Sequence, residues 1–165
     1  MSTHQTNAEL VRWAVERVGA QDLDAARTAW TAGVVVRFPD RVCNGADEAA
    51  AYFADLYAAI DDFRVEVITV AEAGADVFVH WRMTGRHVGP VVGVAGTGRQ
   101  LQIDGMDHFV VRDGRVVSNF VVFDQMQFAR QVGLLPVHAT RADRVLKAVF
   151  NARTKVVDAV TKRGR

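Results

Sequence analysis

The sequence predicts an α+β fold in which helices pack on one face of a curved, antiparallel or mixed sheet. Three observations support this class. Apolar residues recur with the helical period as far as Ile60, and from Phe63 onward they recur with a period of two. Asp113-Gly114 separates two alternating segments, which is a strong hairpin signal. The chain has 165 residues, enough for one domain with a core and too few for two comfortable ones.

Helices are expected first. Asn7 is a suitable N-cap for a helix that ends at Gly19. Asp22 opens a second helix, which carries Trp30 on its inner face and ends at Gly33. A short strand and a third helix follow, at about 34–38 and 47–60.

Four strands and a short helix are expected next. Gly74-Ala75-Asp76 separates the first two strands, a Gly-rich loop through Gly98 precedes the third, and Asp113-Gly114 joins the last two. The helix stops at Gly133. The expected ranges are 63–73, 77–87, 100–112 and 115–123 for the strands, and 125–132 for the helix.

The C-terminal segment differs in charge from the rest of the chain. Residues 140–165 contain eight Lys or Arg residues and two acids, so the segment carries about +6 while the whole chain carries +1. We predict one domain over 1–136 and a basic, amphipathic helical extension over 137–165. The helix is expected at about 142–160, with an apolar stripe of Val145, Leu146, Val149, Phe150, Val156, Val157 and Val160. It could cover the sheet or a partner subunit, dock an acidic carrier protein, or lie on a membrane surface.

Composition excludes several classes of function. Half of the residues are hydrophobic and 24% are charged, as in an ordinary soluble protein, and a net charge of +1 gives no nucleic-acid footprint. No apolar run approaches the roughly 20 residues of a membrane span, and no secretory signal is recognisable. The single cysteine, Cys43, permits no internal disulfide. We therefore expect a cytoplasmic protein.

Four linked motifs carry a family resemblance. They are Gly85-Arg86-His87-Val88-Gly89, Thr97-Gly98-Arg99, Asp113-Gly114-Arg115-Val116 and Gln131-Val132-Gly133. With the helix order before them, they resemble the SnoaL-like polyketide cyclases over roughly 9–136. That family belongs to the nuclear-transport-factor-2-like (NTF2-like) superfamily, which also includes ketosteroid isomerases and epoxide hydrolases.

The resemblance implies a cone-shaped sheet whose concave face, closed by the N-terminal helices, lines a deep apolar pocket. It also implies an enzyme that needs no cofactor or metal and that forms a homodimer through the outer face of the sheet. One superfold hosts many reactions, so the reaction has to be argued from the site itself.

The sequence departs from the cyclase pattern at its catalytic positions. The resemblance places the acid/base aspartate at Val121, the partner histidine at Asp107 and a glutamine at Gly105. His108 is expected on the opposite face from Asp107 because side chains alternate along a strand. The scaffold is therefore present without the usual cyclase base.

Asp107 is the leading candidate for a catalytic residue. A two-residue turn at Asp113-Gly114 predicts that Asp107 pairs with Phe120, which places Phe120 and Val122 on the same face and Asn119 on the opposite one. A carboxyl group among apolar side chains should have a raised pKa and could exchange a proton near neutral pH. The alternative is an aspartate paired with an arginine on a solvated face.

Two further aspartates are candidate proton carriers. Asp40 follows Phe38-Pro39, close to where the resemblance to the isomerases places their proton-shuttling aspartate, although a turn residue is the alternative. Asp124 precedes the last short helix and is either a helix N-cap or a pocket residue. Substrate binding is assigned to the side chains Trp13, Tyr52, Trp81, His87 and Phe120, and no metal site is expected.

Together these features predict an acid–base enzyme, a cyclase, isomerase or dehydratase, acting on a polyketide-like or other apolar carbonyl compound. Asp107 would polarise or protonate the substrate oxygen, and Asp40 or Asp124 would be the second proton carrier. Opening of an epoxide is one alternative, and a non-catalytic binding module of the same fold is another.

Overall fold

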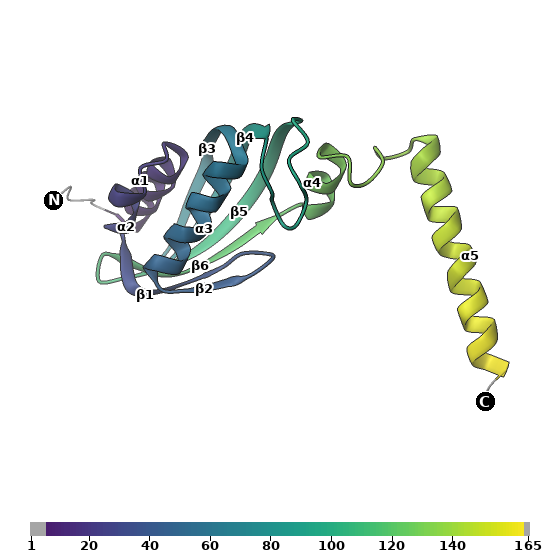
Figure 1. Ribbon diagram of the computed structural model, residues 1–165. Helices are drawn as coiled ribbons and strands as arrows, with labels where there is room; N and C mark the ends of the chain where they lie inside the picture. Colours follow the sequence, from purple (N-terminus) through teal and green to yellow (C-terminus); the bar gives the residue numbers. More distant parts are fainter. Residues whose placement is uncertain (1–5, 164–165) are drawn as a thin grey trace.

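The computed structural model describes the backbone of residues 6–163 and the side chains of residues 6–155. A six-stranded, strongly curved sheet carries helices on its concave side (Figure 1). The predicted α+β class is confirmed. The helices in chain order are α1 (Asn7–Gly19), α2 (Leu23–Arg27), α3 (Ala46–Ala59), α4 (Gln125–Gln131) and α5 (Arg141–Arg163). The strands are β1 (Trp30–Arg37), β2 (Val42–Asn44), β3 (Ile60–Ala73), β4 (Asp76–His87), β5 (Gln100–Arg112) and β6 (Arg115–Phe123).

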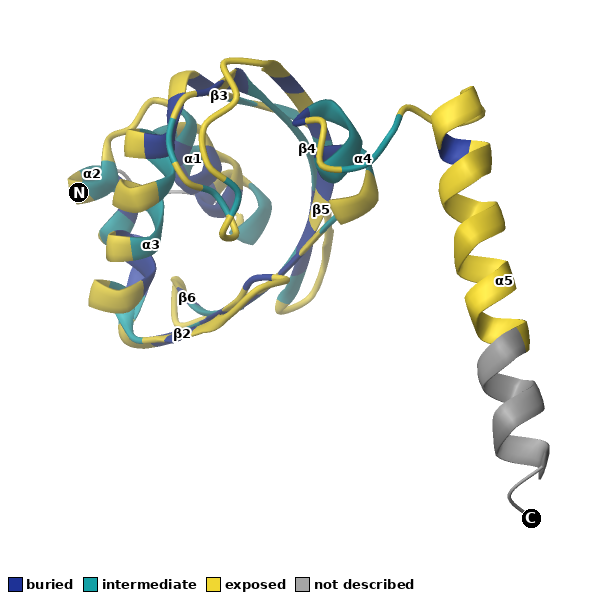
Figure 2. Ribbon diagram, turned by 45° about the vertical axis from the view of Figure 1, so that its right-hand side comes forward, coloured by how far each residue is buried: buried dark blue, intermediate teal, exposed yellow. Residues whose placement is uncertain are grey.

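The strands are ordered β2-β1-β6-β5-β4-β3 across the sheet. All neighbouring pairs are antiparallel except β1 and β6, which run parallel. The sheet is therefore mixed and remains open, because β2 and β3 lie at opposite edges. Seen along its axis, the sheet curls round an interior that α1 and α3 close on the remaining side (Figure 2).

The first helix begins one residue earlier than expected. Thr6, not Asn7, is the N-cap, and it forms a capping box with Glu9 in which each side chain accepts from the other residue's backbone. The second helix is short, because Trp30 begins β1 instead of lying on the helix, and Gly33 lies within that strand. The three-residue strand β2 was not predicted.

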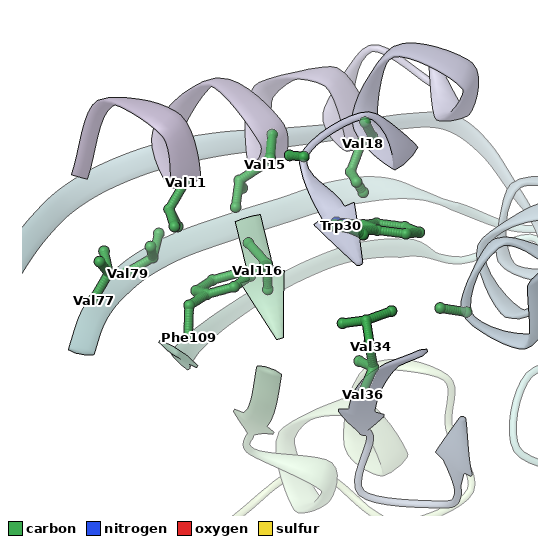
Figure 3. Close-up of a cluster of buried hydrophobic side chains, with 14 of the residues drawn as sticks. Val11, Val15, Val18, Trp30, Val34, Val36, Val77, Val79, Phe109 and Val116 are labelled. Atoms are coloured by element: carbon green, nitrogen blue, oxygen red, sulfur yellow. The ribbon is translucent and has the colours of Figure 1, made fainter. Parts of the chain in front are cut away.

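The main core lies between α1 and the sheet. Val11 of α1 points toward Val77 and Val79 of β4, Val15 lies one turn further along the helix, and all four side chains are less than 9% exposed (Figure 3). Burial of several such side chains, each contributing about 1.5–3 kcal/mol, holds α1 across the concave face. This packing fixes one wall of the interior that the site occupies.

The C-terminal helix α5 stands clear of the rest of the molecule (Figures 1 and 2). Its apolar residues Val145, Leu146, Val149 and Phe150 are 47–66% exposed. Asp143 is buried near the helix start, where it accepts hydrogen bonds from Lys147 and from the backbone of Ala139. The side chains of Val156, Val157 and Val160 lie outside the described residues.

Candidate functional site

The concave face of the sheet and the N-terminal helices enclose an apolar cavity of about 130 Å³. Aliphatic and aromatic side chains from α1, α3 and the strands form most of its wall. Five lining residues also carry an N–H, O–H or carboxyl group: Trp30, Tyr52, Trp81, Asp107 and Asn119. An apolar pocket with a few convergent polar groups is typical of a small-molecule site.

Asp107 lies at the centre of the polar cluster. The indole Nε1 of Trp81 donates to its Oδ1 at 2.7 Å, and Nδ2 of Asn119 donates to its Oδ2 at 2.8 Å. The residue is 8% exposed, and it lines the cavity. The alternative of an arginine pair is wrong, because both carboxylate oxygens are bound by neutral donors.

Burial raises the pKa of Asp107 from 3.8 to about 6, and the hydrogen bonds from Asn119 and Trp81 oppose this rise. Desolvation outweighs the two donors because a buried carboxylate loses the stabilisation that water gives its charge. The carboxyl group can therefore gain and lose a proton near neutral pH, which is the requirement for a general acid or base.

Gly105 makes the contact between Trp81 and Asp107 possible. Gly105 pairs directly with Trp81 across β4 and β5, and a Cβ atom built on Gly105 would collide with the six-membered ring of the indole. Without a side chain at 105, the indole can lie over the β5 backbone and reach the carboxyl group two residues along the strand. Gly105 stands at the position where the resemblance places a glutamine, and here it provides space for tryptophan.

The predicted hairpin register is wrong by one residue. The turn and the pair Arg112–Arg115 are as expected, but a bulge at Val117 moves the later pairs, so that Asp107 faces Val121 and Phe120 faces His108. Because the side-chain period is two, this slip turns Asn119 and Val121 toward the cavity and Phe120 away from it. Sequence reasoning missed Asn119 for this reason.

Asp40 contacts the cavity wall indirectly. The hydroxyl of Tyr52, which lines the cavity, donates to Oδ1 of Asp40 at 3.2 Å, and Arg41 pairs with the other carboxylate oxygen at 3.3 Å. Burial, and then the nearby Asp40 charge, raise the pKa of Tyr52, so its hydroxyl stays protonated and remains a donor. Asp40 itself is not part of the cavity lining.

Asp124 is the N-cap of α4. Its Oδ1 accepts from the backbone N–H groups of Met126 and Gln127, each at 2.9 Å, and the residue is exposed outside the cavity. Of the two alternatives for Asp124, helix N-cap or pocket residue, the structure shows the helix N-cap.

The structure places only some of the five residues assigned to substrate binding in the wall of the cavity. Tyr52 and Trp81 line the cavity, whereas Trp13 packs against the core beside it. Phe120 is 52% exposed on the convex face, because of the register slip.

His87 is fully buried at the end of β4, below the loop formed by residues 88–99. Its Nδ1 lies 3.2 Å from Oγ1 of Thr97, and its carbonyl oxygen accepts from the backbone N–H groups of Thr97 and Gly98. Burial lowers the pKa of the imidazole, which favours the neutral form. His87 is outside the cavity lining and holds the loop that supplies Val91 and Val92 to the cavity.

The comparison with protein families identifies the scaffold. A family model described as SnoaL-like polyketide cyclase matches residues 8–132. The chain belongs to the SnoaL-like polyketide cyclase family. In this SnoaL-like protein, Val121 stands at the position where the resemblance places the acid/base aspartate. It pairs with Asp107 on the neighbouring strand, and both residues line the cavity.

Solved structures share the fold of this SnoaL-like protein. A candidate SnoaL-like polyketide cyclase from Jannaschia sp. CCS1 is 22% identical, with a TM-score of 0.69 over 82% of this chain and 100% of that one. AclR, a candidate hydroxylase from Streptomyces galilaeus, is 22% identical, with a TM-score of 0.68 over 94% of both chains. A Catenulispora acidiphila protein with a ketosteroid isomerase-like fold is 15% identical, with a TM-score of 0.67 over 78% of this chain and 95% of that one. No curated protein matches the chain.

Two further observations concern metals and membranes. Within the described residues, no group of three or more His, Cys, Asp or Glu side chains is arranged to hold a metal ion. Over the same part of the chain, no helix combines the length and the apolar character that crossing a bilayer requires.

Proposed function

We propose that the protein is an acid–base enzyme of the SnoaL-like type. In this proposal, Asp107 moves a proton from one atom of an apolar carbonyl substrate to another. The observation that carries the proposal is a buried carboxyl group, with a pKa of about 6, at the wall of an otherwise apolar cavity. Cyclases and isomerases both require such a group, because each moves a proton between two atoms of one substrate.

The ionised form of Asp107 starts the reaction. Each of its oxygens accepts one hydrogen bond from the protein and keeps a lone pair for the substrate. The carboxylate takes the proton from a carbon next to the carbonyl group, and the electron pair of the C–H bond forms the enolate. The resulting carboxylic acid then returns the proton to another carbon, which completes an isomerisation. Alternatively, the enolate carbon attacks a second carbonyl carbon, and the acid protonates the new alkoxide.

Trp81 and Asn119 position the carboxyl group for this step. Their two hydrogen bonds fix both oxygens, so the carboxyl group cannot turn away from the substrate. The apolar wall excludes water, which makes the carboxylate a stronger base than an exposed aspartate. Tyr52, whose hydroxyl donates to Asp40, is a further polar side chain of the cavity wall.

Opening of an epoxide, one of the alternatives, would need two carboxylates that bracket a water or hydroxyl group. Asp107 is the one acidic residue among the described residues that line the cavity, and Asp40 is reached only through Tyr52. The single carboxyl group fits a proton shuttle better. A binding module would use the same cavity without turnover, and the experiment below separates it from an enzyme.

The experiment measures exchange of the α-hydrogens of 2-tetralone, a bicyclic ketone, for deuterium in D₂O by NMR. The wild-type protein should accelerate exchange, and Asp107→Asn should reduce the acceleration at least about 100-fold. Asp124→Asn is the matched control, because Asp124 caps a helix outside the cavity, and it should keep the exchange activity. Binding of 2-tetralone without exchange by the wild-type protein would favour the binding module. Equal exchange by wild-type protein and Asp107→Asn would contradict the role of Asp107.

A further inference from the structure

Asn119 holds the one buried side-chain polar atom without a hydrogen-bond partner among the described residues that line the cavity. The residue is 7% exposed, so bulk water does not reach it freely. Its Nδ2 donates to Asp107, which leaves Oδ1 as the unpartnered atom. A buried acceptor without a donor costs free energy, and in native proteins such atoms call for an explanation.

The orientation of the Asn119 amide follows from the charge of its neighbour. An ionised carboxylate only accepts hydrogen bonds, so the amide must turn its N–H group toward Asp107 and its oxygen away from it. Trp81 already donates to the other carboxylate oxygen, and the hydroxyl of Tyr52 donates to Asp40. Oδ1 of Asn119 is therefore an acceptor that the other polar groups of the cavity wall leave unused.

We infer that Oδ1 of Asn119 accepts a hydrogen bond from a hydroxyl group of the ligand, which makes Asn119 a specificity-determining residue and hydroxylated carbonyl compounds the preferred substrates. The inference rests on the proposed function, since it takes the same cavity as the substrate site. Oxygen and nitrogen of one amide share a carbon atom, so a hydroxyl bound to Oδ1 lies close to the Asp107 carboxyl group. The matching substrate carries its hydroxyl near the carbon that loses the proton, as in enolised 1,3-dicarbonyl compounds and hydroxyaryl ketones.

We expect Oδ1 of Asn119 to discriminate strongly between ligands that carry a hydroxyl donor and ligands that lack one. A plain ketone offers no donor and leaves Oδ1 unpaired after it has displaced any water from the cavity. Sites with a polar group reserved for a ligand hydroxyl reject analogues that lack it, because the reserved group is then buried without a partner. A water molecule on Oδ1 is the competing explanation and makes the opposite prediction for ligand preference.

The test compares binding of 2-naphthol and 2-methoxynaphthalene by isothermal titration calorimetry. Both oxygens accept hydrogen bonds, but only the naphthol donates one. The wild-type protein should bind 2-naphthol about tenfold more tightly, a ratio in the range of one hydrogen bond. Asn119→Leu should reduce this ratio to about one while it still binds 2-methoxynaphthalene. Asn119→Ala should give the same ratio if leucine prevents folding.

Two controls complete the test. Asp124→Asn should keep the tenfold ratio, because Asp124 caps α4 outside the cavity. Val121→Ala, which changes the cavity wall without a polar group, should weaken both ligands equally. Both results would support Asn119 as the acceptor.

Several outcomes would overturn the inference. A ratio near one in the wild-type protein would mean that water satisfies Oδ1, and a ratio that survives Asn119→Leu would mean that another group selects the hydroxyl. Failure of both compounds to bind the wild-type protein would also reject the inference. Deuterium exchange in 2-tetralone is a separate readout, so the proposed function can fail or hold independently.

Discussion

Asp107 on β5 lies directly opposite Val121 on β6, and both side chains face the cavity. The resemblance to the cyclases places an acid/base aspartate at the position of Val121. The carboxyl group of this protein is therefore found one strand away from the expected position, at the same wall of the cavity. Trp81 and Asn119 hold it there.

The first prediction concerns the space above Gly105. Gly105→Ala should displace the Trp81 indole, because the added Cβ would collide with its ring, and should cost about 2 kcal/mol in the free energy of unfolding. Urea denaturation followed by tryptophan fluorescence measures the loss. Gly33→Ala is the control, since a Cβ there meets no atom within 4 Å. Equal stability of the two variants would show that the indole does not need this space.

The second prediction concerns the hydrogen bond from Trp81. This bond stabilises the ionised form of Asp107 and lowers its pKa. Trp81→Phe should therefore raise the pKa by about one unit. The pH midpoint of deuterium exchange, at which the rate rises as Asp107 ionises, should move upward from about 6 by the same amount. A midpoint that is unchanged or lower would contradict the contact.

The third prediction concerns stability as a function of pH. The folded state raises the pKa of Asp107 from 3.8 to about 6. Between these two values the folded protein binds more protons than the unfolded chain, so its stability falls as the pH rises. The full cost above pH 6 is about 3 kcal/mol, at about 1.4 kcal/mol for each pKa unit.

Asp107→Asn removes this cost, because an amide does not ionise. The variant should be about 1–3 kcal/mol more stable than the wild-type protein at pH 8, and the difference should shrink toward pH 4. Urea denaturation at a series of pH values measures both. A variant that loses stability equally at every pH would show that burial of the ionised carboxylate does not destabilise the folded protein.

The fourth prediction concerns the convex patch, defined as Phe78, Met106, Phe120 and Val122, which are 42–55% exposed on neighbouring strands. Exposed apolar patches commonly mark protein interfaces, so we expect a homodimer formed through this face. Phe120→Glu should produce monomers in light scattering after size exclusion. Val42→Glu, at a residue 50% exposed on the edge strand β2, should leave the dimer intact. A wild-type monomer at micromolar concentration would contradict the expectation.

Much of the fold follows from the sequence. The ranges of β5 and β6 were predicted without error, because Asp113 and Gly114 adopt positive φ angles, of 50° and 69°, in the two-residue turn that their sequence favours. Trp30 was assigned to a helix since its spacing from Ala26 also fits a helical stripe, and only pairing with β6 makes it a strand residue.

The site was less accessible to sequence reasoning. Burial of Asp107 follows from its apolar neighbours, but Asn119 faces the cavity only because of the bulge at Val117, where Val-Val-Ser contains no glycine to signal one. β6 lies between β1 and β5 in the sheet, so the bulge forms in a strand that pairs on both sides. The contact of Trp81 with Asp107 likewise depends on the alignment of β4 with Gly105.

The most direct test of the central claim is an NMR titration of the aspartate carboxyl carbons in ¹³C-labelled protein. The signal of Asp107 is the one that disappears in Asp107→Asn. We predict that it titrates with a pKa of about 6 in the wild-type protein. A midpoint near 3.8, the ordinary value for an aspartate, would mean that water reaches the carboxyl group, and the proposed proton shuttle would be wrong.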